Sequence, residues 1–412
     1  MISLRRLFAT LLLVLLAALW LAPRAHAAAG AYEAELPADL PTARDMCALV
    51  PCKDVFPGAS HFSERKGQPP YVEAYDNDSA QKKLLGYVML STDITDTPAY
   101  SGKPVVTLIG MDTQGRFVGV KVLKHSEPIL LLGIPESALL KFNAQYLGKS
   151  VADKIEVGQS RPDENVLGLD AISGATVTVI AQNQVMMASG SAVARQVGIL
   201  APTVREPARY AETGKRLSWA ELVQQGTVQR LRVLPEQVGL DKGPDPFIEL
   251  WFGDLNHPDI GKSLLGDNGW NSLRLQLKEG EHAFFIVRTG GKESFKGSGF
   301  VRGGIFDRVQ VKQGADSFTF RDLDALNLYG LEAAGAPSYN ESAIFIIRSQ
   351  AFSAAYPWKF AFLGNRVDRA TGHRSFAVFE SKYWLPAALL DGGRPKVKEP
   401  DAPWVRIWKS QA

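Results

Sequence analysis

The residues best suited to chemistry in this chain form a turn rich in small side chains, residues 170–178. Its Ser and Thr residues place hydroxyl groups where an apolar helix is expected to begin, at Thr176. The first N–H groups of a helix lack partners within it and lie at the positive end of the helix dipole, so a phosphate binds favourably there. Gly174 allows the backbone to approach a bulky anion closely. A hydroxyl in this turn can therefore hold a phosphate non-covalently or be esterified by one.

Ordinary helix capping explains the same residues without any ligand. Ser and Thr are preferred at the start of a helix because the side-chain oxygen accepts a backbone N–H. The turn alone does not distinguish capping from phosphate binding, and it does not specify a flavin.

The turn resembles the flavinylation motif of the FMN-binding domain family. The matching residues are Asp170, Ser173, Gly174, Ala175 and Thr176. In that family a flavin transferase joins FMN through its phosphate to the Thr of the motif, so the resemblance implies covalent attachment at Thr176. Asp170 matches the leading acid of the motif, and Thr178 is a second candidate for the attachment. The resemblance covers roughly residues 80–198.

Residues upstream of the turn extend the resemblance. The segment 103–123 is similar to the strand, Asp-x-x-Gly turn and strand that precede the flavin site in this family. Many members continue with Glu-Thr-Pro-Gly, whereas residues 125–136 of this chain resemble the NosR family, the membrane flavoproteins of nitrous oxide respiration. This resemblance predicts that His125 and Glu127 border the isoalloxazine ring of FMN. The alternative is that both residues end a strand and face solvent.

The resemblance implies an electron-transfer flavoprotein rather than a stand-alone enzyme. FMN on Thr176 would support nitrous oxide reductase activity, maturation or expression. The implied partners are that reductase or its maturation proteins, the flavin transferase, and a membrane-embedded iron–sulfur part. The membrane helices and Cys-rich motifs of the family do not occur in this sequence. We therefore expect either a fragment or a shorter protein that needs another subunit.

Two alternative functions come from other classes of protein. In the first, residues 217–395 form a non-redox interaction or regulatory module, and the flavin is structural or absent. In the second, the chain is a flavin subunit of an Rnf or quinone-reductase type of complex. Those subunits usually lack so large a β-rich extension, which argues against the second alternative.

The N-terminus reads as a signal peptide, residues 1–27. Arg5 and Arg6 precede an apolar run over residues 7–21, and Ala25-His26-Ala27 is a small-x-small cleavage site. The run is short for a membrane span, although an uncleaved anchor is the alternative. The formal net charge is +3, and residues 1–27 hold three Arg and no acid, so the mature chain is neutral. We expect a periplasmic protein that does not bind nucleic acid.

The two cysteines, Cys47 and Cys52, lie on the expected exported side, where disulfides persist. They predict a local disulfide; the alternative is a redox-active or partner-facing pair. Two cysteines cannot hold an iron–sulfur cluster, which typically takes four. The histidines are scattered, so no metal site is expected; those considered are His61, His257, His282 and His373.

The predicted fold class is α+β, with an antiparallel FMN-binding domain followed by a β-rich domain. The expected boundaries are an irregular cap over residues 28–80, the FMN-binding domain over 81–200, a linker over 201–216, the β-rich domain over 217–395 and a tail approaching a membrane over 396–412. In the first domain we expect a hairpin of 105–109 with 117–123, a helix opened by Pro135, and a buried helix over 176–197.

Short apolar runs separated by glycine turns predict a sandwich or barrel for the second domain. The expected strands are 247–252, 273–277, 283–287, 300–301, 309–311, 343–347, 360–362 and 375–379, after a short helix at 218–225. Trp404 and Trp408 in the tail resemble the aromatic belt beside a membrane span.

Overall fold

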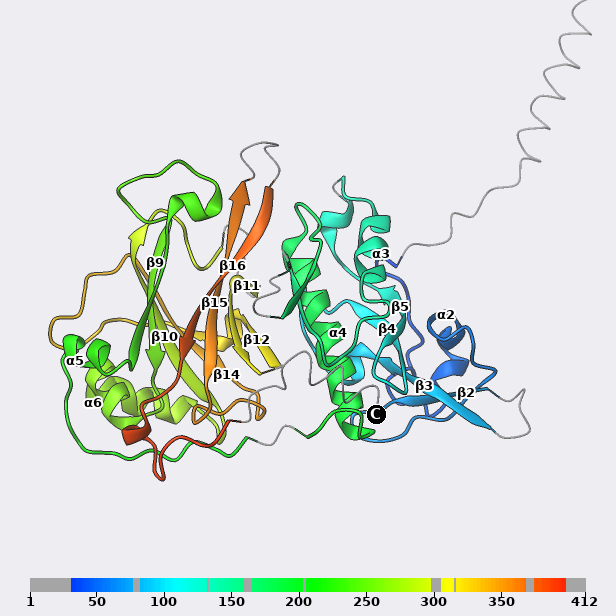
Figure 1. The fold of residues 1–412 in the computed structure, drawn as a ribbon, viewed down its shortest axis with the longest axis horizontal. Helices are drawn as coiled ribbons and strands as arrows, with labels where there is room; N and C mark the ends of the chain where they lie inside the picture. Colours follow the sequence, from blue (N-terminus) through cyan, green and yellow to red (C-terminus); the bar gives the residue numbers. More distant parts are fainter. Residues whose placement is uncertain are drawn as a thin grey trace, which may run out of the picture.

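The computed structural model shows two domains side by side (Figure 1). It describes residues 31–76, 82–131, 133–158, 160, 165–202, 205–297, 305–314, 316–367 and 374–397. The expected signal peptide, the strand at 300–301, His373, and Trp404 and Trp408 of the tail lie outside the described residues. Among the described helices, none has the length and apolar character needed to cross a bilayer.

The first domain is built on a five-stranded antiparallel sheet in the order β1-β2-β3-β4-β5. Its strands are β1 (His61–Phe62), β2 (Val72–Asp76), β3 (Lys83–Leu90), β4 (Val106–Asp112) and β5 (Phe117–Lys124). The expected hairpin is the β4–β5 pair, which confirms that part of the prediction. Segment 28–80 differs from the irregular cap that we expected, because β1 and β2 join this same sheet.

Both faces of this sheet are covered, which explains why β3 reads as a continuous apolar run. Tyr87 and Met89 face the core beneath the long helices, whereas Val88 and Leu90 face the N-terminal cap. Successive strand residues point to opposite faces, so a strand buried on both sides needs no polar alternation.

The cap approaches the sheet closely through α2 (Cys52–Val55). A Cβ atom on Gly110 or Gly119, which are paired across β4 and β5, would lie 2.3 or 2.1 Å from the backbone oxygen of Val55. Only glycine fits there. The disulfide between Cys47 and Cys52 closes the cap immediately beside this contact.

Helices α3 (Glu136–Ala144) and α4 (Thr176–Gln196) cover the other face of the sheet. Between them lies a parallel pair of short strands that we did not expect, β6 (Lys154–Val157) and β7 (Val166–Leu169). Four residues per strand are too few for a reliable periodic signal.

The second domain is a sandwich of two antiparallel sheets, which confirms the β-rich prediction and the α+β class. One sheet has the order β13-β14-β10-β9-β8 and the other β12-β11-β15-β16. The strands are β8 (Val228–Val233), β9 (Ile248–Asp254), β10 (His282–Gly291), β11 (Ile305–Gln313), β12 (Asp316–Arg321), β13 (Ala325–Leu326), β14 (Glu341–Ile347), β15 (Trp358–Val367) and β16 (Arg374–Tyr383). Phe252 of β9 stacks on Phe360 of β15 with ring centroids 4.5 Å apart, so the two sheets share one core.

Two helices accompany the sandwich, α5 (Trp219–Gln224) and α6 (Pro258–Gln276). The strand expected at residues 273–277 is wrong, because most of this segment is the last turn of α6. Its alternating leucines imitate a strand, but Leu273 is buried whereas Leu275 is 89% exposed. Helix α6 begins at Pro258 with His257 as its N-cap, and it is kinked at Gly266, whose φ of +69° is not helical.

The domains meet where α4 faces the second sheet of the sandwich (Figure 1). The Thr319 hydroxyl donates to Gln184 Oε1 of α4 at 3.1 Å. Lys312 Nζ lies 3.1 Å from Glu156 Oε2 of β6 and 3.0 Å from Glu380 Oε1 of β16. Leu363 of the sandwich packs into the core of the first domain. Arg205 of the expected linker also contacts the sandwich, since its Nη1 lies 2.8 Å from Asp316 Oδ2.

Stability should depend on pH through Glu380. Burial raises the pKa of this carboxyl, but Lys312 and Lys359 outweigh burial and lower the pKa from its ordinary 4.5 to about 2. A carboxyl whose pKa is lower in the folded state than in the unfolded state stabilises the fold at pH values above its unfolded pKa. This stabilisation is lost as the pH falls towards the folded-state pKa. We expect Glu380→Gln to reduce the free energy of unfolding by about 2 kcal/mol at pH 7, after allowance for solvent screening.

Urea unfolding of wild type and Glu380→Gln as a function of pH measures this effect. The difference between them should shrink below pH 4.5 and vanish near pH 2. Glu236→Gln, at an exposed position, serves as the control and should change stability by less than about 0.5 kcal/mol. A difference that stayed constant down to pH 2 would contradict the prediction.

Candidate functional site

The predicted attachment turn is the connection from β7 into α4. Gly174 has a φ of +83°, a backbone conformation that side-chain-bearing residues rarely adopt. The Ala175 N–H donates to the Ile172 oxygen at 3.0 Å and closes the turn. Ser173 and Gly174 are exposed and Thr176, the first residue of α4, is partly exposed. The turn therefore presents a backbone bend and two accessible hydroxyls at the start of a helix of 21 residues.

Helix capping does not account for these hydroxyls. The N-cap position is occupied by Ala175, and within the described part of the chain no side chain caps the first turn. The positive end of α4 is therefore available to a negatively charged group. These features fit the phosphate of FMN, with Thr176 as the residue that would hold it and the first backbone N–H groups of α4 beside it.

Gln145, which sequence reasoning missed, fixes the other end of the turn. Its Oε1 accepts the Asp170 N–H at 2.8 Å, and its Nε2 donates to the Asp170 oxygen at 3.1 Å. The Asp170 side chain itself is exposed. Gln145 follows α3 as its C-cap residue, and nothing in the local sequence distinguishes it from a surface glutamine.

Glu127 holds the first turn of α4 from inside the protein. Its carboxylate is fully buried and accepts the hydroxyl proton of Thr178. It also accepts the N–H of Tyr100 at 3.1 Å and the N–H of Ser101 at 2.9 Å. Thr178, the second attachment candidate, is thus buried and already bonded. The contacts of Glu127 join the loop after η2 (Ser91–Asp93), the segment after β5 and α4.

His125 is also buried, beneath the N-terminal segment. Its Nδ1 accepts the Glu127 N–H at 3.2 Å, and its Nε2 lies 3.6 Å from Glu136 Oε1. The His125 N–H donates to the Ala31 oxygen at 2.8 Å, and the Tyr32 ring packs edge-on to the imidazole. Neither His125 nor Glu127 faces solvent, so the alternative that both do is wrong. That they border the isoalloxazine ring stays a prediction.

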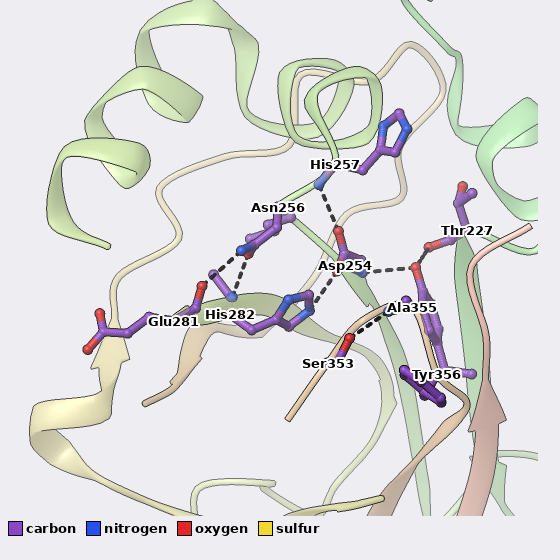
Figure 2. A network of polar contacts seen from close by, with 12 residues as sticks. Thr227, Asp254, Asn256, His257, Glu281, His282, Ser353, Ala355 and Tyr356 are labelled. Carbon is purple, nitrogen blue, oxygen red and sulfur yellow. Dashed lines mark hydrogen bonds and ion pairs between the residues drawn. The ribbon is translucent and has the colours of Figure 1, made fainter. Parts of the chain in front are cut away.

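A second buried polar network lies in the β-rich domain, around Asp254 at the end of β9. Figure 2 shows Asp254 between His257 and His282. Asp254 Oδ1 accepts the His257 N–H at 2.9 Å, and Oδ2 lies 2.6 Å from His282 Nε2. Asn256 bridges neighbouring backbone, accepting the Ala283 N–H at 2.7 Å. Each group is turned inward at the junction of β9, α6 and β10.

No cluster of three His, Cys, Asp or Glu side chains suited to a metal ion occurs among the described residues. Asp254 is also bonded to the sandwich core. Its N–H donates to the Tyr383 hydroxyl at 3.1 Å, and that hydroxyl donates to the Thr227 oxygen at 2.9 Å. We interpret the network as the structural anchor of the β9–α6 corner.

The comparisons with known proteins cover the segment that holds the turn before α4. Residues 100–188 match the FMN-binding domain family, a segment that holds Glu127, Gln145 and Thr176. The chain therefore carries an FMN-binding domain. It is 38% identical over 383 residues to the regulatory protein NosR of Pseudomonas aeruginosa, which covers 86% of this chain and 52% of that protein. Over the part that it spans, the chain is similar to the NosR proteins.

More distant relatives agree with this assignment. The protein NirI of Paracoccus denitrificans is 25% identical over 276 residues, or 65% of this chain and 39% of that protein. A component of the Na⁺-translocating ferredoxin:NAD⁺ oxidoreductase complex of Acetobacterium woodii is 30% identical over 139 residues, or 34% of this chain and 62% of that component. The chain spans about half the length of the NosR relatives it matches.

Proposed function

We propose that this chain carries FMN covalently on Thr176 and relays electrons in support of nitrous oxide reduction. The observation that carries the proposal is the accessible, uncapped start of α4 at Thr176, within the segment that matches the FMN-binding domain family. The bound flavin would supply the electron-transfer chemistry. The chain's own residues would hold it: Gln145 fixes the turn, and Glu127 fixes the helix that follows.

The proposed location is the periplasm. The expected signal peptide and the disulfide between Cys47 and Cys52 support it, because disulfides persist in oxidising compartments. Covalent attachment is useful in that setting, where a freely dissociating cofactor would be lost by diffusion.

The proposed partners follow from the relatives. They are a flavin transferase, nitrous oxide reductase or its maturation proteins, and a membrane-embedded iron–sulfur part of the same or another chain. A relative bears the name regulatory protein. We propose that any regulatory effect of this chain arises through its redox state rather than through contact with DNA.

The attachment is tested by exporting the chain in a host with an active flavin transferase and examining a denaturing gel for flavin fluorescence. Wild type should be labelled, and Thr176→Val should lose the label because the acceptor oxygen is gone. Thr42→Val makes the same substitution at an exposed position outside the turn and should remain labelled, which makes it the matched control. Thr178→Val should not abolish labelling, since that hydroxyl is buried against Glu127.

An unlabelled wild type, beside a labelled control substrate of the same transferase, would overturn the proposal. The interaction-module alternative would then be the better account. A Thr176→Val protein that kept its label would move the attachment to another hydroxyl.

A further inference from the structure

Helix α3 lies alongside the segment that leads into α4, and it contacts that segment at both ends. At its C-terminal end, Gln145 is hydrogen-bonded to both the N–H and the oxygen of Asp170. Just before its N-terminal end, the Ile134 side chain lies against the turn, because a Cβ atom on Gly174 would be 3.2 Å from Ile134 Cδ1. The segment from Asp170 to Gly174 therefore runs beside α3 in the opposite direction.

One exposed face of α3 is turned toward this segment. Residues three or four apart lie on the same face of a helix, so Lys141 lies one turn before Gln145, on the face that contacts Asp170. Leu139 and Phe142 are buried in the domain core, whereas Lys141 is exposed. Its flexible four-carbon stem allows the ammonium group to move along the segment toward the turn.

Lys141 is a cation without a counterion in the part of the chain that the structure describes. It forms no ion pair or hydrogen bond there, whereas the Nζ of Lys149 donates to the Gln145 oxygen. No other Lys or Arg occurs in residues 127–146 or 165–180, the segments that contain α3, the turn and the first turn of α4. A phosphate at the turn therefore has Lys141 as its available cation.

The charges at the turn favour such a cation. The ester of FMN with a threonine keeps one negative charge on its phosphate. The exposed carboxylate of Asp170 adds a second negative charge in the same segment. Like charges repel, and a lysine ammonium binds phosphate oxygens as a point charge through strong, charge-assisted hydrogen bonds. Lys141 therefore complements the phosphate, which the protein would otherwise hold next to an acid.

We propose that Lys141 binds the phosphate of the flavin attached at Thr176 and thereby holds the ester against α3. The inference rests on the attachment proposed above. It adds a residue outside the turn to the flavin site. The group that this residue recognises is the phosphoester, not the ring of the flavin.

The reactivity of lysines toward acetic anhydride, read by mass spectrometry of peptides, tests the contact on the full chain. Lys141 should react about three- to fivefold more slowly in the flavin-carrying protein than in the same chain exported without the transferase, the equivalent of one exposed ion pair. This protection should disappear in about 1 M salt, where the screening length is about 3 Å. Lys53 is the internal control, because it is exposed on α2, on the other face of the sheet, and should react equally in both proteins.

Substitution provides a second test. Lys141→Glu places a negative charge beside the phosphate and should reduce the covalently labelled fraction on a denaturing gel about threefold, whereas Lys141→Arg keeps the positive charge and should stay near wild type. Lys53→Glu makes the matched charge reversal away from the turn and should be labelled as wild type. Far-UV circular dichroism checks that each variant is folded.

A labelled wild type in which Lys141 reacts as fast as in the unlabelled chain would overturn the phosphate contact and leave the attachment intact. Protection that survived in high salt would also overturn it, because shielding by the bulk of the flavin does not depend on charge. Equal labelling of folded Lys141→Glu and wild type would overturn it as well. Wild type without covalent flavin, beside a labelled control substrate, would overturn the attachment itself and the contact with it.

Discussion

Glu127→Ala is expected to reduce the free energy of unfolding by about 3–5 kcal/mol, because the N–H groups of Tyr100 and Ser101 and the Thr178 hydroxyl would all lose a buried acceptor. The first turn of α4 would lose its internal anchor at the same time. We therefore also expect covalent flavin on Thr176 to fall strongly. Urea unfolding followed by far-UV circular dichroism measures the first effect, and gel fluorescence measures the second.

The conservative variant Glu127→Gln keeps the size of the side chain, so it distinguishes the hydrogen-bonding role of the carboxylate from simple filling of space. Its amide can still accept one hydrogen bond but presents an NH₂ group in place of the second oxygen, so both effects should be intermediate. Glu35→Ala, at an exposed position, should change neither quantity. Glu127→Ala with wild-type stability and labelling would refute the role that we assign to this carboxylate.

Asp254→Ala is expected to destabilise the second domain by about 3–5 kcal/mol, since its removal leaves His282 and the His257 N–H buried without their partner. Every tryptophan that the structure describes lies in that domain, so intrinsic tryptophan fluorescence during urea unfolding reports on it selectively. Covalent labelling of Thr176 should persist, because the attachment turn belongs to the other domain.

The control for this prediction is Asp245→Ala, at an exposed position of the same domain. It should change the free energy of unfolding by less than about 0.5 kcal/mol. An Asp254→Ala protein whose tryptophan transition matched that of wild type would show that the network around Asp254 is not the anchor of the β9–α6 corner.

The sequence alone was sufficient for features that depend on neighbouring residues. The turn before α4, the start of α4 at Thr176 and the β4–β5 hairpin were all predicted, because turn chemistry and apolar periodicity act over a few residues. The local signal failed where it was ambiguous. The leucines before Leu277 alternate as in a strand, yet they form the last turn of α6 after the kink at Gly266.

Only the tertiary structure decided what surrounds the turn. Glu127 and Thr178 are 51 residues apart in sequence, and Gln145 and Asp170 are 25 apart. Gln184 and Thr319, from different domains, are 135 apart. Such contacts depend on how the chain returns to the same place in space, which no pattern within a short window encodes. The sequence thus determined the turn and the helix start at which we propose that the flavin is attached, whereas the packing of the chain decided which side chains support them.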